Sequence, residues 1–541
     1  MEQLDRDLQT LDASKDAWAR LPLERKIALL DGLKRSIYAL APQWVQAAAR
    51  AKGLKPDSHL AGEEWISGPW AVLYAVNRYI RTLRGIAARG ASPVPKPHVR
   101  ADGRTVVDVF PRTAYDRVLL SGISAQVWMQ PGVRPADVVR EAGSFYAQAQ
   151  PKGRVALVLG AGNIASIPPL DVLYKLLESG SVCMLKMNPV NEYLGPIFER
   201  AFSAFVDAGY LRFAYGGADV GAYLCGHDLV EEIHVTGSEA THNAIVSSVR
   251  DRKHVTSELG NVSPTIVIPG PWTDDDLAFQ AENIATQKAH NAGFNCIAAQ
   301  VLILPKAWNL AGTLRDRVVA VFDRMEQRPE YYPGAAARRA RLAGDRSRLR
   351  SAVSVDPTGI DNPAFTTEAF CGVLACVELS GEIEAYVRDA VAFANDRLHG
   401  TLGVNLVVHP ATMKGHPDVL DRALAQLRYG CVAVNGWTGI GYFISETPWG
   451  AFPGHTVQDA GSGIGVVHNS YLLARTEKSI VHAPFAPFPR SLRGGEFSLL
   501  PRPPWFVTNR MQAEIGRALC DFEVSPSPRG AVRIASLAMR G

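Results

Sequence analysis

Cys296 is the residue of this sequence whose neighbours best suit covalent chemistry. It lies in the segment Asn291-Ala-Gly-Phe-Asn-Cys-Ile297, between a glycine turn and the apolar stretch Gln300–Leu304, which predicts a strand. An accessible thiolate is a nucleophile for carbonyl carbon atoms. Most cysteines, however, are buried as small apolar side chains. The segment alone therefore leaves both interpretations open.

Two candidate bases accompany this thiol in the sequence. Glu258 lies in Thr256-Ser-Glu-Leu-Gly-Asn261, where a strand meets a loop, and its carboxylate is either a water-activating base or a surface charge. His290 lies six residues before Cys296, so it is either the base of a Cys–His hydrolase or acyltransferase, or a structural histidine. No HExxH motif or carboxylate cluster indicates a metal site, so we expect none.

A glycine-rich turn, Gly160-Ala-Gly-Asn-Ile-Ala165, follows a predicted strand and precedes a predicted helix. The pattern is typical of a dinucleotide-binding turn, in which phosphate binds at the start of the helix. That motif also requires an acidic residue about 20 positions later to hold the ribose. The sequence has Lys186, Met187 and Asn188 there instead, so the strict NAD fingerprint fails.

Two further glycine segments begin helices downstream. Gly217 and Gly221 follow one predicted strand, and Gly237-Ser238 follows the next. Small residues at the start of a helix let a phosphate reach the backbone N–H groups, and Ser238 can also act as a helix N-cap. Capping explains each segment alone, but two in successive strand–helix units favour a dinucleotide site.

The elements that must position these residues predict an α/β fold. Residues 11–53, 60–88 and 135–149 have helical periodicity, and 105–110 and 125–129 have strand periodicity. From 154 to 236, and again from about 264 to 450, strands alternate with helices, which is typical of parallel sheets covered by helices. Beyond 482 the chain is rich in proline and predicts one helix near 510–520.

Length and composition restrict the class of protein further. The chain has 541 residues, too many for one hydrophobic core, and 57 basic against 53 acidic residues give a net charge of +4. We therefore expect neither nucleic acid nor a membrane as partner. No secretory signal or membrane-spanning stretch is visible. Seven scattered cysteines without CxxC spacing argue against disulfides or zinc and favour a cytoplasmic location.

Taken together, these residues resemble the aldehyde dehydrogenase superfamily. The resemblance covers about residues 15–480 and is strongest at 155–304. The motifs that carry it, in order, are Asn163, Lys186, Gly237-Ser238, Glu258-Leu-Gly260, Cys296, Glu368-Ala-Phe370, Asn435 and Pro448-Trp-Gly450. The resemblance implies oxidation of an aldehyde to a carboxylic acid, with NAD or NADP as cofactor.

The resemblance also implies a role for each residue. Cys296 would form a thiohemiacetal and then a thioester, Asn163 would stabilise the oxyanion, and Glu258 would activate water for deacylation. Lys186 would contact the adenosine ribose, Ser238 the pyrophosphate and Glu368 the nicotinamide ribose. The full predicted cofactor site consists of Lys186, Asn188, Gly217, Gly221, Gly237, Ser238, Leu259, Glu368 and Phe370.

Some positions depart from the family pattern. Pro189 stands where many NAD-preferring members have a glutamate, so a 2′-phosphate is not repelled and the choice between NAD and NADP stays open. Ala161-Gly162 replaces the usual Pro-Trp, and Asn261 replaces the second glycine of Glu-Leu-Gly-Gly. The nearest alternative function is a CoA-acylating dehydrogenase or acyl-CoA reductase. Glu258 argues against it, because a water-activating base is dispensable when CoA accepts the acyl group.

The family's architecture implies how the chain divides. We expect a dinucleotide-binding domain at 1–103 and 132–259 and a catalytic domain at 260–467. Strands within 104–131 and 468–482 are expected to bridge subunits of a homodimer or homotetramer. Residues 483–541 are a Pro-rich C-terminal extension to which we assign no function.

Four aromatic residues crowd one part of the expected catalytic domain: Trp437, Tyr442, Phe443 and Trp449. Such side chains either line the entrance for a bulky apolar or aromatic aldehyde, or pack as ordinary core. The sequence favours neither interpretation over the other.

Overall fold

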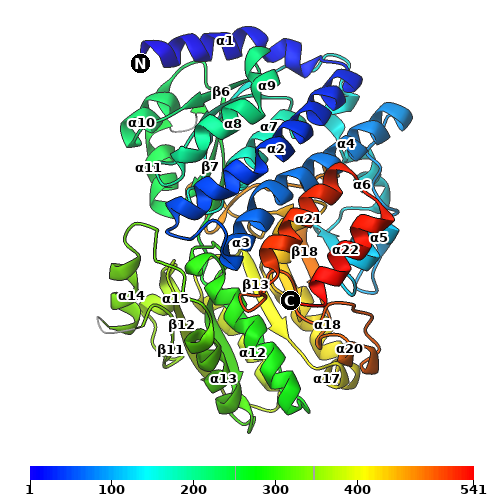
Figure 1. Cartoon of the computed structure of the whole chain (residues 1–541), viewed down its shortest axis with the longest axis vertical. Coiled ribbons are helices and arrows are strands. Elements are labelled where there is room, and N and C mark those ends of the chain that lie inside the picture. Colours follow the sequence, from blue (N-terminus) through cyan, green and yellow to red (C-terminus); the bar gives the residue numbers. More distant parts are fainter. Residues whose placement is uncertain (250–251, 345–347) are drawn as a thin grey trace.

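A computed structural model describes residues 1–249, 252–344 and 348–541, which form two sheets with helices around each (Figure 1). The smaller sheet and its helices lie in the upper half of Figure 1, and the larger sheet lies in the lower half. This arrangement agrees with the predicted α/β class.

The smaller sheet has the order β16-β8-β7-β4-β5-β6 in the described part of the chain. Its parallel strands are β4 (Val155–Leu159), β5 (Val182–Lys186), β6 (Leu211–Ala214), β7 (Glu232–Gly237) and β8 (His254–Leu259). The helices between them are α7 (Ile167–Glu178), α8 (Gly195–Ala201), α9 (Ser203–Asp207), α10 (Ala218–Gly226) and α11 (Glu239–Val249). The short strand β16 (Gly463–Ile464) pairs antiparallel with β8, so a late segment of the chain returns to this sheet.

The larger sheet is ten-stranded within the described residues, in the order β1-β2-β3-β18-β14-β13-β9-β10-β12-β11. Its parallel part is β9 (Ser263–Val267), β10 (Ala299–Pro305), β11 (Ser351–Ser354), β12 (Val373–Leu379), β13 (Gly403–Val407), β14 (Cys431–Val434) and β18 (Thr476–His482). The antiparallel part is β1 (His98–Val99), β2 (Thr105–Phe110) and β3 (Ser124–Met129).

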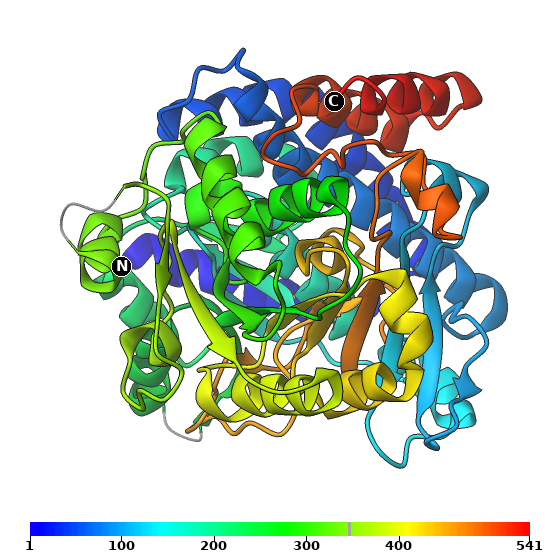
Figure 2. The same cartoon turned by 90° about the horizontal axis from the view of Figure 1, so that it is seen from below.

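Helices cover both faces of the larger sheet because its strands are apolar on both sides. Val301 and Ile303 of β10 pack with α16 (Ile383–Arg397) and α18 (Pro417–Gln426). Leu302 and Leu304 point to the other face, toward α12 (Asp274–Ala289) and α13 (Ala311–Arg324). Figure 2 shows these helix pairs, yellow and green, on opposite faces.

The strands expected to bridge subunits lie in the sheet of their own chain. β18 pairs parallel with β14, with Ser479 opposite Cys431. β3 then pairs antiparallel with the other edge of β18, and β2 with β3. The larger sheet therefore continues without a break from the expected catalytic strands into the expected bridging strands.

The two ends of the chain pack together. The N-terminal helices are α1 (Glu2–Ala19), α2 (Leu23–Ala51), α3 (Gly62–Trp65) and α4 (Ala71–Arg89), and the extension forms α20 (Arg490–Arg493), α21 (Gln512–Val524) and α22 (Pro528–Ala538). In Figures 1 and 2 the red C-terminal helices lie against the blue N-terminal ones, and α21 contacts α2, α3 and α4. The prediction of one helix in the extension is wrong, because α20 and α22 form in addition to α21; Ser527 caps α22, whose first residue is Pro528.

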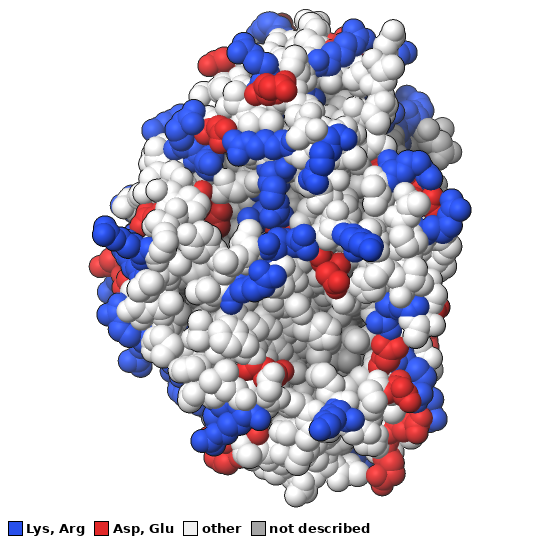
Figure 3. Space-filling view, turned by 90° about the vertical axis from the view of Figure 1, so that its right-hand side faces the viewer, with Lys and Arg blue, Asp and Glu red and all other residues white. Residues whose placement is uncertain are grey.

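Shorter elements complete the fold: α5 (Ala114–Leu119), α6 (Pro135–Glu141), α14 (Ala335–Ala343), α15 (Pro363–Thr366), α17 (Pro410–Gly415), α19 (Gly439–Phe443), β15 (Pro448–Trp449) and β17 (Val467–His468). The helix predicted over 135–149 ends early, and Gly143 follows it in the left-handed conformation. Within the described residues, no helix combines the length and the hydropathy needed to span a membrane. Figure 3 shows acidic and basic side chains interspersed on one face, with a group of basic ones in its upper half.

Candidate functional site

The residues predicted to do chemistry meet where the two sheets face each other. In the smaller sheet they follow the carboxyl ends of strands: Asn163 after β4, Ser238 after β7 and Glu258 near the end of β8. In the larger sheet they precede strands: Cys296 lies before β10 and Glu368 before β12. Crevices at the carboxyl ends of parallel strands are the usual ligand sites of such sheets.

Cys296 and Glu258 are hydrogen-bonded to each other. The Cys296 thiol donates to Glu258 Oε1 at 3.5 Å, although 38 residues separate the two in sequence. Among the described residues, which include all seven cysteines, Cys296 alone is not fully buried. The thiol singled out from the sequence is therefore the accessible one, and it lies beside the predicted base.

Glu258 is held in a nearly dry environment. The Trp449 indole N–H donates to Oε1 at 2.7 Å, whereas Oε2 is buried and has no hydrogen-bond partner within the described structure. Burial, and then the charge of Asp171, raise the pKa of Glu258 to about 7, against the hydrogen bonds from Trp449 and Cys296. A carboxyl with this pKa can accept and release a proton near neutral pH.

The Cys296 thiol is not activated in this arrangement. Burial raises its pKa well above the ordinary value, and the neighbouring charges of Glu258 and Glu368 raise it further. The low-pKa setting expected of a nucleophilic cysteine is therefore absent from the described surroundings. A proton acceptor must take the thiol proton during attack, and Glu258 is placed to do so.

Asn163 contacts the loop that carries the thiol. The Asn163 amide Nδ2 donates to the backbone carbonyl of Phe294 at 2.9 Å. Since an amide carries two N–H groups, one remains for an oxyanion. The side chain is 8% exposed and lines the same two cavities as Cys296.

A cavity of about 420 Å³ opens beside Cys296 and extends to the start of α11. It brings together nine of the twelve residues predicted from the sequence: Asn163, Asn188, Gly237, Ser238, Glu258, Leu259, Cys296, Glu368 and Phe370. Lys186, Gly217 and Gly221 do not line it. Lys186 ends β5, Gly217 precedes α10 and Gly221 lies within α10.

Some residues that line this cavity were not predicted from the sequence. Tyr332, Arg338, Thr367 and His399 line it. The Arg338 guanidinium donates to the Phe370 carbonyl at 3.2 Å, and Phe370 is held at φ +40°. Arg338 belongs to an arginine-rich helix that reads as a solvated surface, so no local pattern marks it.

Glu368 retains unused hydrogen-bonding capacity toward the cavity. Its Oε1 is buried without a partner in the described structure. Burial raises its pKa to about 8, although the N–H of Asn261 and the charge of Arg338 oppose this. A β-carbon at Gly260 would lie 2.5 Å from Glu368 Oε2, so glycine there lets the carboxyl approach the backbone.

A second, smaller cavity also borders Cys296. The four aromatic residues Trp437, Tyr442, Phe443 and Trp449 line it together with Ile164, Ile167 and Ile297. Its volume is about 30 Å³, room for about two water molecules. The aromatic side chains are therefore both a cavity wall at the thiol and closely packed core.

His290 borders this cavity but does not contact the thiol as a base would. Its Nδ1 lies 3.2 Å from Asn295 Nδ2, and its ring packs on Trp437 at a centroid distance of 4.7 Å. The hydrogen bond of the Cys296 thiol goes to Glu258. The geometry therefore does not favour the Cys–His hydrolase interpretation.

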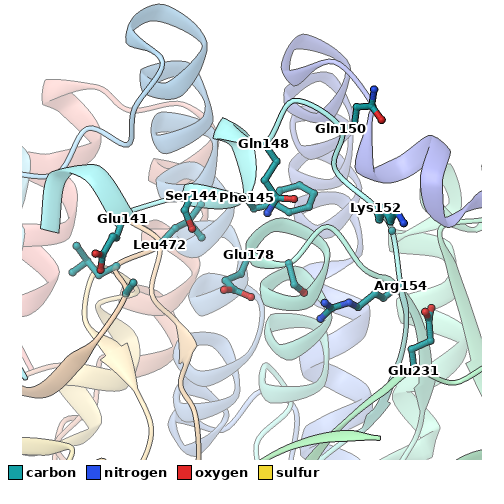
Figure 4. A pocket seen from close by; sticks show the side chains of 15 residues that line it. Glu141, Ser144, Phe145, Gln148, Gln150, Lys152, Arg154, Glu178, Glu231 and Leu472 are labelled. Atoms are coloured by element: carbon teal, nitrogen blue, oxygen red, sulfur yellow. The ribbon is translucent and has the colours of Figure 1, made fainter. Parts of the chain in front are cut away.

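A third cavity, of about 570 Å³, lies elsewhere (Figure 4). Glu141, Glu178, Glu231, Lys152 and Arg154 give it mixed charge. It shares no lining residue with the cavity at Cys296. In the described part of the chain, no three His, Cys, Asp or Glu side chains gather as a metal site would require.

Comparisons with known proteins agree with this geometry. Residues 129–330 match the sequence profile of the aldehyde dehydrogenase family. A coniferyl aldehyde dehydrogenase of a Pseudomonas species is 25% identical over 179 residues, which are 33% of this chain and 36% of that protein. The 4-trimethylaminobutyraldehyde dehydrogenase A of Danio rerio is 30% identical over 128 residues, 23% of this chain and 25% of that protein. These alignments thus span only about a quarter to a third of the curated relatives.

Solved structures match over much more of the chain. Aldehyde dehydrogenase C of Pseudomonas syringae superimposes with a TM-score of 0.60 at 16% identity, covering 90% of both chains. The glyceraldehyde-3-phosphate dehydrogenase of Methanocaldococcus jannaschii gives 0.60 at 15% identity, covering 89% of this chain and 94% of that one. Residues 129–330, which include the thiol segment, thus match the aldehyde dehydrogenase family, and the chain has the fold of aldehyde dehydrogenases.

Proposed function

We propose that this protein oxidises an aldehyde to a carboxylic acid with NAD or NADP, through a thioester on Cys296. The observation that carries the proposal is the Cys296–Glu258 hydrogen bond of 3.5 Å between two cavities, one large and polar, the other small and aromatic. The thiol can then attack an aldehyde held in the smaller cavity, and the hydride can pass to a dinucleotide held in the larger one.

The residues present fit a dinucleotide in the larger cavity. Ser238 precedes the N-terminus of α11, where phosphate oxygens find backbone N–H groups. Glu368, with its unpartnered Oε1, suits a ribose hydroxyl. When bound, the dinucleotide accepts the hydride. Pro189 gives no carboxylate to repel a 2′-phosphate. One structure of the same fold was solved with NAD+ and another with NADP. We therefore propose that either cofactor can bind.

The side chains account for each proton in the reaction. Glu258 takes the thiol proton as the Cys296 sulfur bonds to the aldehyde carbon, and the second N–H of Asn163 binds the oxyanion. After the hydride has left, the carbon is a thioester. Glu258 releases the thiol proton to solvent and then removes a proton from water, whose oxygen adds to the thioester carbon. Glu258 returns that proton to the departing Cys296 sulfur, which yields the carboxylic acid and the free thiol.

Water, rather than CoA, is proposed as the acyl acceptor. Glu258 has a pKa near neutrality and an unpartnered Oε2 beside the thiol, features that serve a water-activating base. A CoA-accepting enzyme does not need such a base. A turnover rate that depends on added CoA would instead support the acyl-CoA reductase alternative.

An apolar aldehyde is the proposed substrate class. The second cavity is lined by aromatic and aliphatic side chains, and its volume of about 30 Å³ limits what enters without movement of those rings. The relative from Pseudomonas is named for the aromatic coniferyl aldehyde. A series of straight-chain and aromatic aldehydes of increasing size, ranked by kcat/KM, measures this limit.

A cytoplasmic location and a homo-oligomeric assembly are also proposed. Seven unpaired cysteines suit the reducing cytoplasm. A homodimer or homotetramer is proposed from the superfamily resemblance, with the outer edge at β1 as a free sheet edge for pairing. Analytical ultracentrifugation at micromolar concentration measures the mass of the assembly, and the mass of a monomer would overturn the proposal.

The test of the activity itself uses purified protein, NAD or NADP, and the aldehyde series. Dinucleotide reduction that needs both aldehyde and Cys296 is the expected result. Full activity in Cys296→Ala would overturn the proposed function.

A further inference from the structure

Four charged side chains are buried together beside the loop that carries Cys296. This charge cluster consists of Lys52, Glu63, Glu64 and Arg328, each at most 4% exposed. Lys52 Nζ lies 3.0 Å from Glu64 Oε2, and Arg328 Nε lies 3.2 Å from Glu63 Oε2. Burying an unpaired charge costs several kcal/mol, so two cations and two carboxylates persist here only in a well-matched geometry.

The charge cluster contacts the thiol loop directly at Asn291. Glu63 Oε2 accepts the Asn291 backbone N–H at 2.8 Å, and Lys52 Nζ donates to Asn291 Oδ1 at 3.0 Å. Asn291 and Ala292 have φ values of +52° and +59°. The left-handed conformation costs a residue with a β-carbon about 1–2 kcal/mol, so contacts from outside the loop must hold it.

The same network reaches the loop of Asn163. The Asn163 backbone carbonyl accepts from Asn291 Nδ2 at 3.1 Å and from Lys52 Nζ at 3.4 Å. The Tyr331 hydroxyl lies 3.0 Å from that carbonyl and 3.1 Å from Asn291 Oδ1. The loop with the oxyanion-binding amide and the loop with the thiol therefore share their hydrogen-bond partners.

The C-terminal extension fixes the short helix that carries two members of the cluster. Glu63 and Glu64 lie in α3, which packs against α21, and Figure 1 shows these helices side by side. The contact is made at two glycines: a β-carbon on Gly62 would overlap Gln512, and one on Gly516 would overlap Trp65. The two helices thus meet at backbone distance, which only glycine allows.

We propose that the charge cluster positions the reacting groups. The cluster holds Asn291, and Asn291 in turn fixes the distance between the loop of Asn163 and the loop of Cys296. The C-terminal extension keeps the cluster assembled because α21 packs against α3. This inference rests on the proposed function. Glu63 and Lys52 are positioning residues, since their hydrogen bonds end on Asn291, Glu64 and the Asn163 carbonyl.

The first test compares two substitutions at Glu63. Glu63→Ala removes the acceptor of the Asn291 N–H, whereas Glu63→Gln keeps an acceptor oxygen of the same reach. We expect Glu63→Ala to lower kcat on the order of 10²-fold while KM changes less than about threefold, since small misplacements of reacting groups cost this much. Glu63→Gln is expected to restore most of the rate.

A second variant keeps the test valid if Glu63→Ala does not fold. Tyr331→Phe deletes one hydroxyl and leaves all four charges in place, so the fold is expected to survive. Its kcat should fall about tenfold, with KM nearly unchanged. Folded Tyr331→Phe and Glu63→Ala proteins that both turn over at the wild-type rate would overturn the proposal.

The geometry of the thiol gives a readout that needs no catalysis. Alkylation of Cys296 by iodoacetamide, followed by peptide mass spectrometry against pH, reports its environment. Tyr331→Phe and Glu63→Ala should change the rate severalfold or move its pH midpoint; unchanged profiles in both would contradict the inference. If the wild-type protein oxidises no aldehyde, the proposed function fails while this measurement still tests the positioning.

The role of the extension is tested at the glycine contact. Gly516→Ala should reduce kcat severalfold and alter the alkylation profile, because the added methyl group pushes α21 away from α3. Gly312→Ala in α13 is the matched control, since a β-carbon there meets nothing within 4 Å. If Gly516→Ala lowers the melting temperature but leaves kcat and alkylation unchanged, the extension has no positioning role.

Discussion

Replacing Trp449 by phenylalanine should move the pH at which the enzyme becomes active. In the wild type, the Trp449 indole N–H donates to Glu258 Oε1 at 2.7 Å and so stabilises the charged carboxylate. Burial and Asp171 act in the opposite direction and raise the pKa of Glu258 to about 7. Phenylalanine fills most of the same space but donates no hydrogen bond, so only the raising influences and the thiol contact remain.

The size of the shift follows from that one hydrogen bond. Hydrogen bonds to charged groups contribute about 1.5–3 kcal/mol, and one pKa unit corresponds to about 1.4 kcal/mol. The Trp449→Phe variant should therefore have its Glu258 pKa raised by about 1–2 units. The rate of thioester hydrolysis, which needs the carboxylate, should reach half its maximum near pH 8–9, about 1–2 units above the wild-type midpoint.

The assay forms the acyl-enzyme with aldehyde and dinucleotide, removes the excess, and follows thioester hydrolysis from pH 5.5 to about 9.5, around the predicted range. Trp437→Phe is the matched control, because its indole N–H lines the same small cavity but has no hydrogen-bond partner in the described structure. Its midpoint should stay at the wild-type value. An unchanged midpoint in folded Trp449→Phe would refute the assignment of Glu258 as the base that this indole tunes.

Three further predictions follow from the charges and amides described above. Glu258→Gln should melt at a higher temperature than the wild type at pH 8. The pKa of Glu258 is about 7 in the folded chain and 4.5 in the unfolded chain. The wild type therefore loses up to about 3 kcal/mol of folding stability as the pH rises from 4.5 to 7. Lys26→Met should stabilise by about 1–3 kcal/mol at pH 7, because burial lowers the Lys26 pKa to about 8. The Lys26 ammonium has no hydrogen-bond partner in the described structure and lies over the ring of Trp18. Denaturant titrations should show that advantage fading between pH 8 and 10.5, as the unfolded chain also releases its proton; a constant advantage would contradict it. Asn163→Ala should lower kcat by about 10²–10³ with little change in KM if its amide binds the oxyanion, and a loss confined to KM would speak against that role.

Much of the site could be predicted because its parts are short and local. Strand, turn and helix patterns around Gly160–Ala165 and Gly237-Ser238 predicted that polar groups gather at one sheet edge, where Asn163 and Ser238 lie. The glycine turn and the predicted strand on either side of Cys296 indicated this thiol, and Glu258 is within hydrogen-bond distance of it. These features depend on a few neighbouring residues, which a single sequence displays.

The parts that could not be predicted depend on contacts between distant residues. The charge cluster joins residues 52, 63 and 64 to Arg328, more than 260 positions away, and each member reads alone as a surface charge. The raised pKa of the Cys296 thiol arises from burial and from Glu368, neither of which local sequence reveals. Likewise, the pairing of β18 with β14 joins strands more than 40 residues apart, and no local pattern marks the two as partners.

The covalent intermediate tests the central claim most directly. The wild-type enzyme, mixed with an aldehyde and NAD or NADP and quenched in acid within the first turnover, should carry an acyl group on the peptide that contains Cys296, together with one reduced dinucleotide per acyl group. Mass spectrometry of that peptide measures both its site and its mass. An unmodified Cys296 peptide despite dinucleotide reduction, or an acyl group on another residue, would contradict the account.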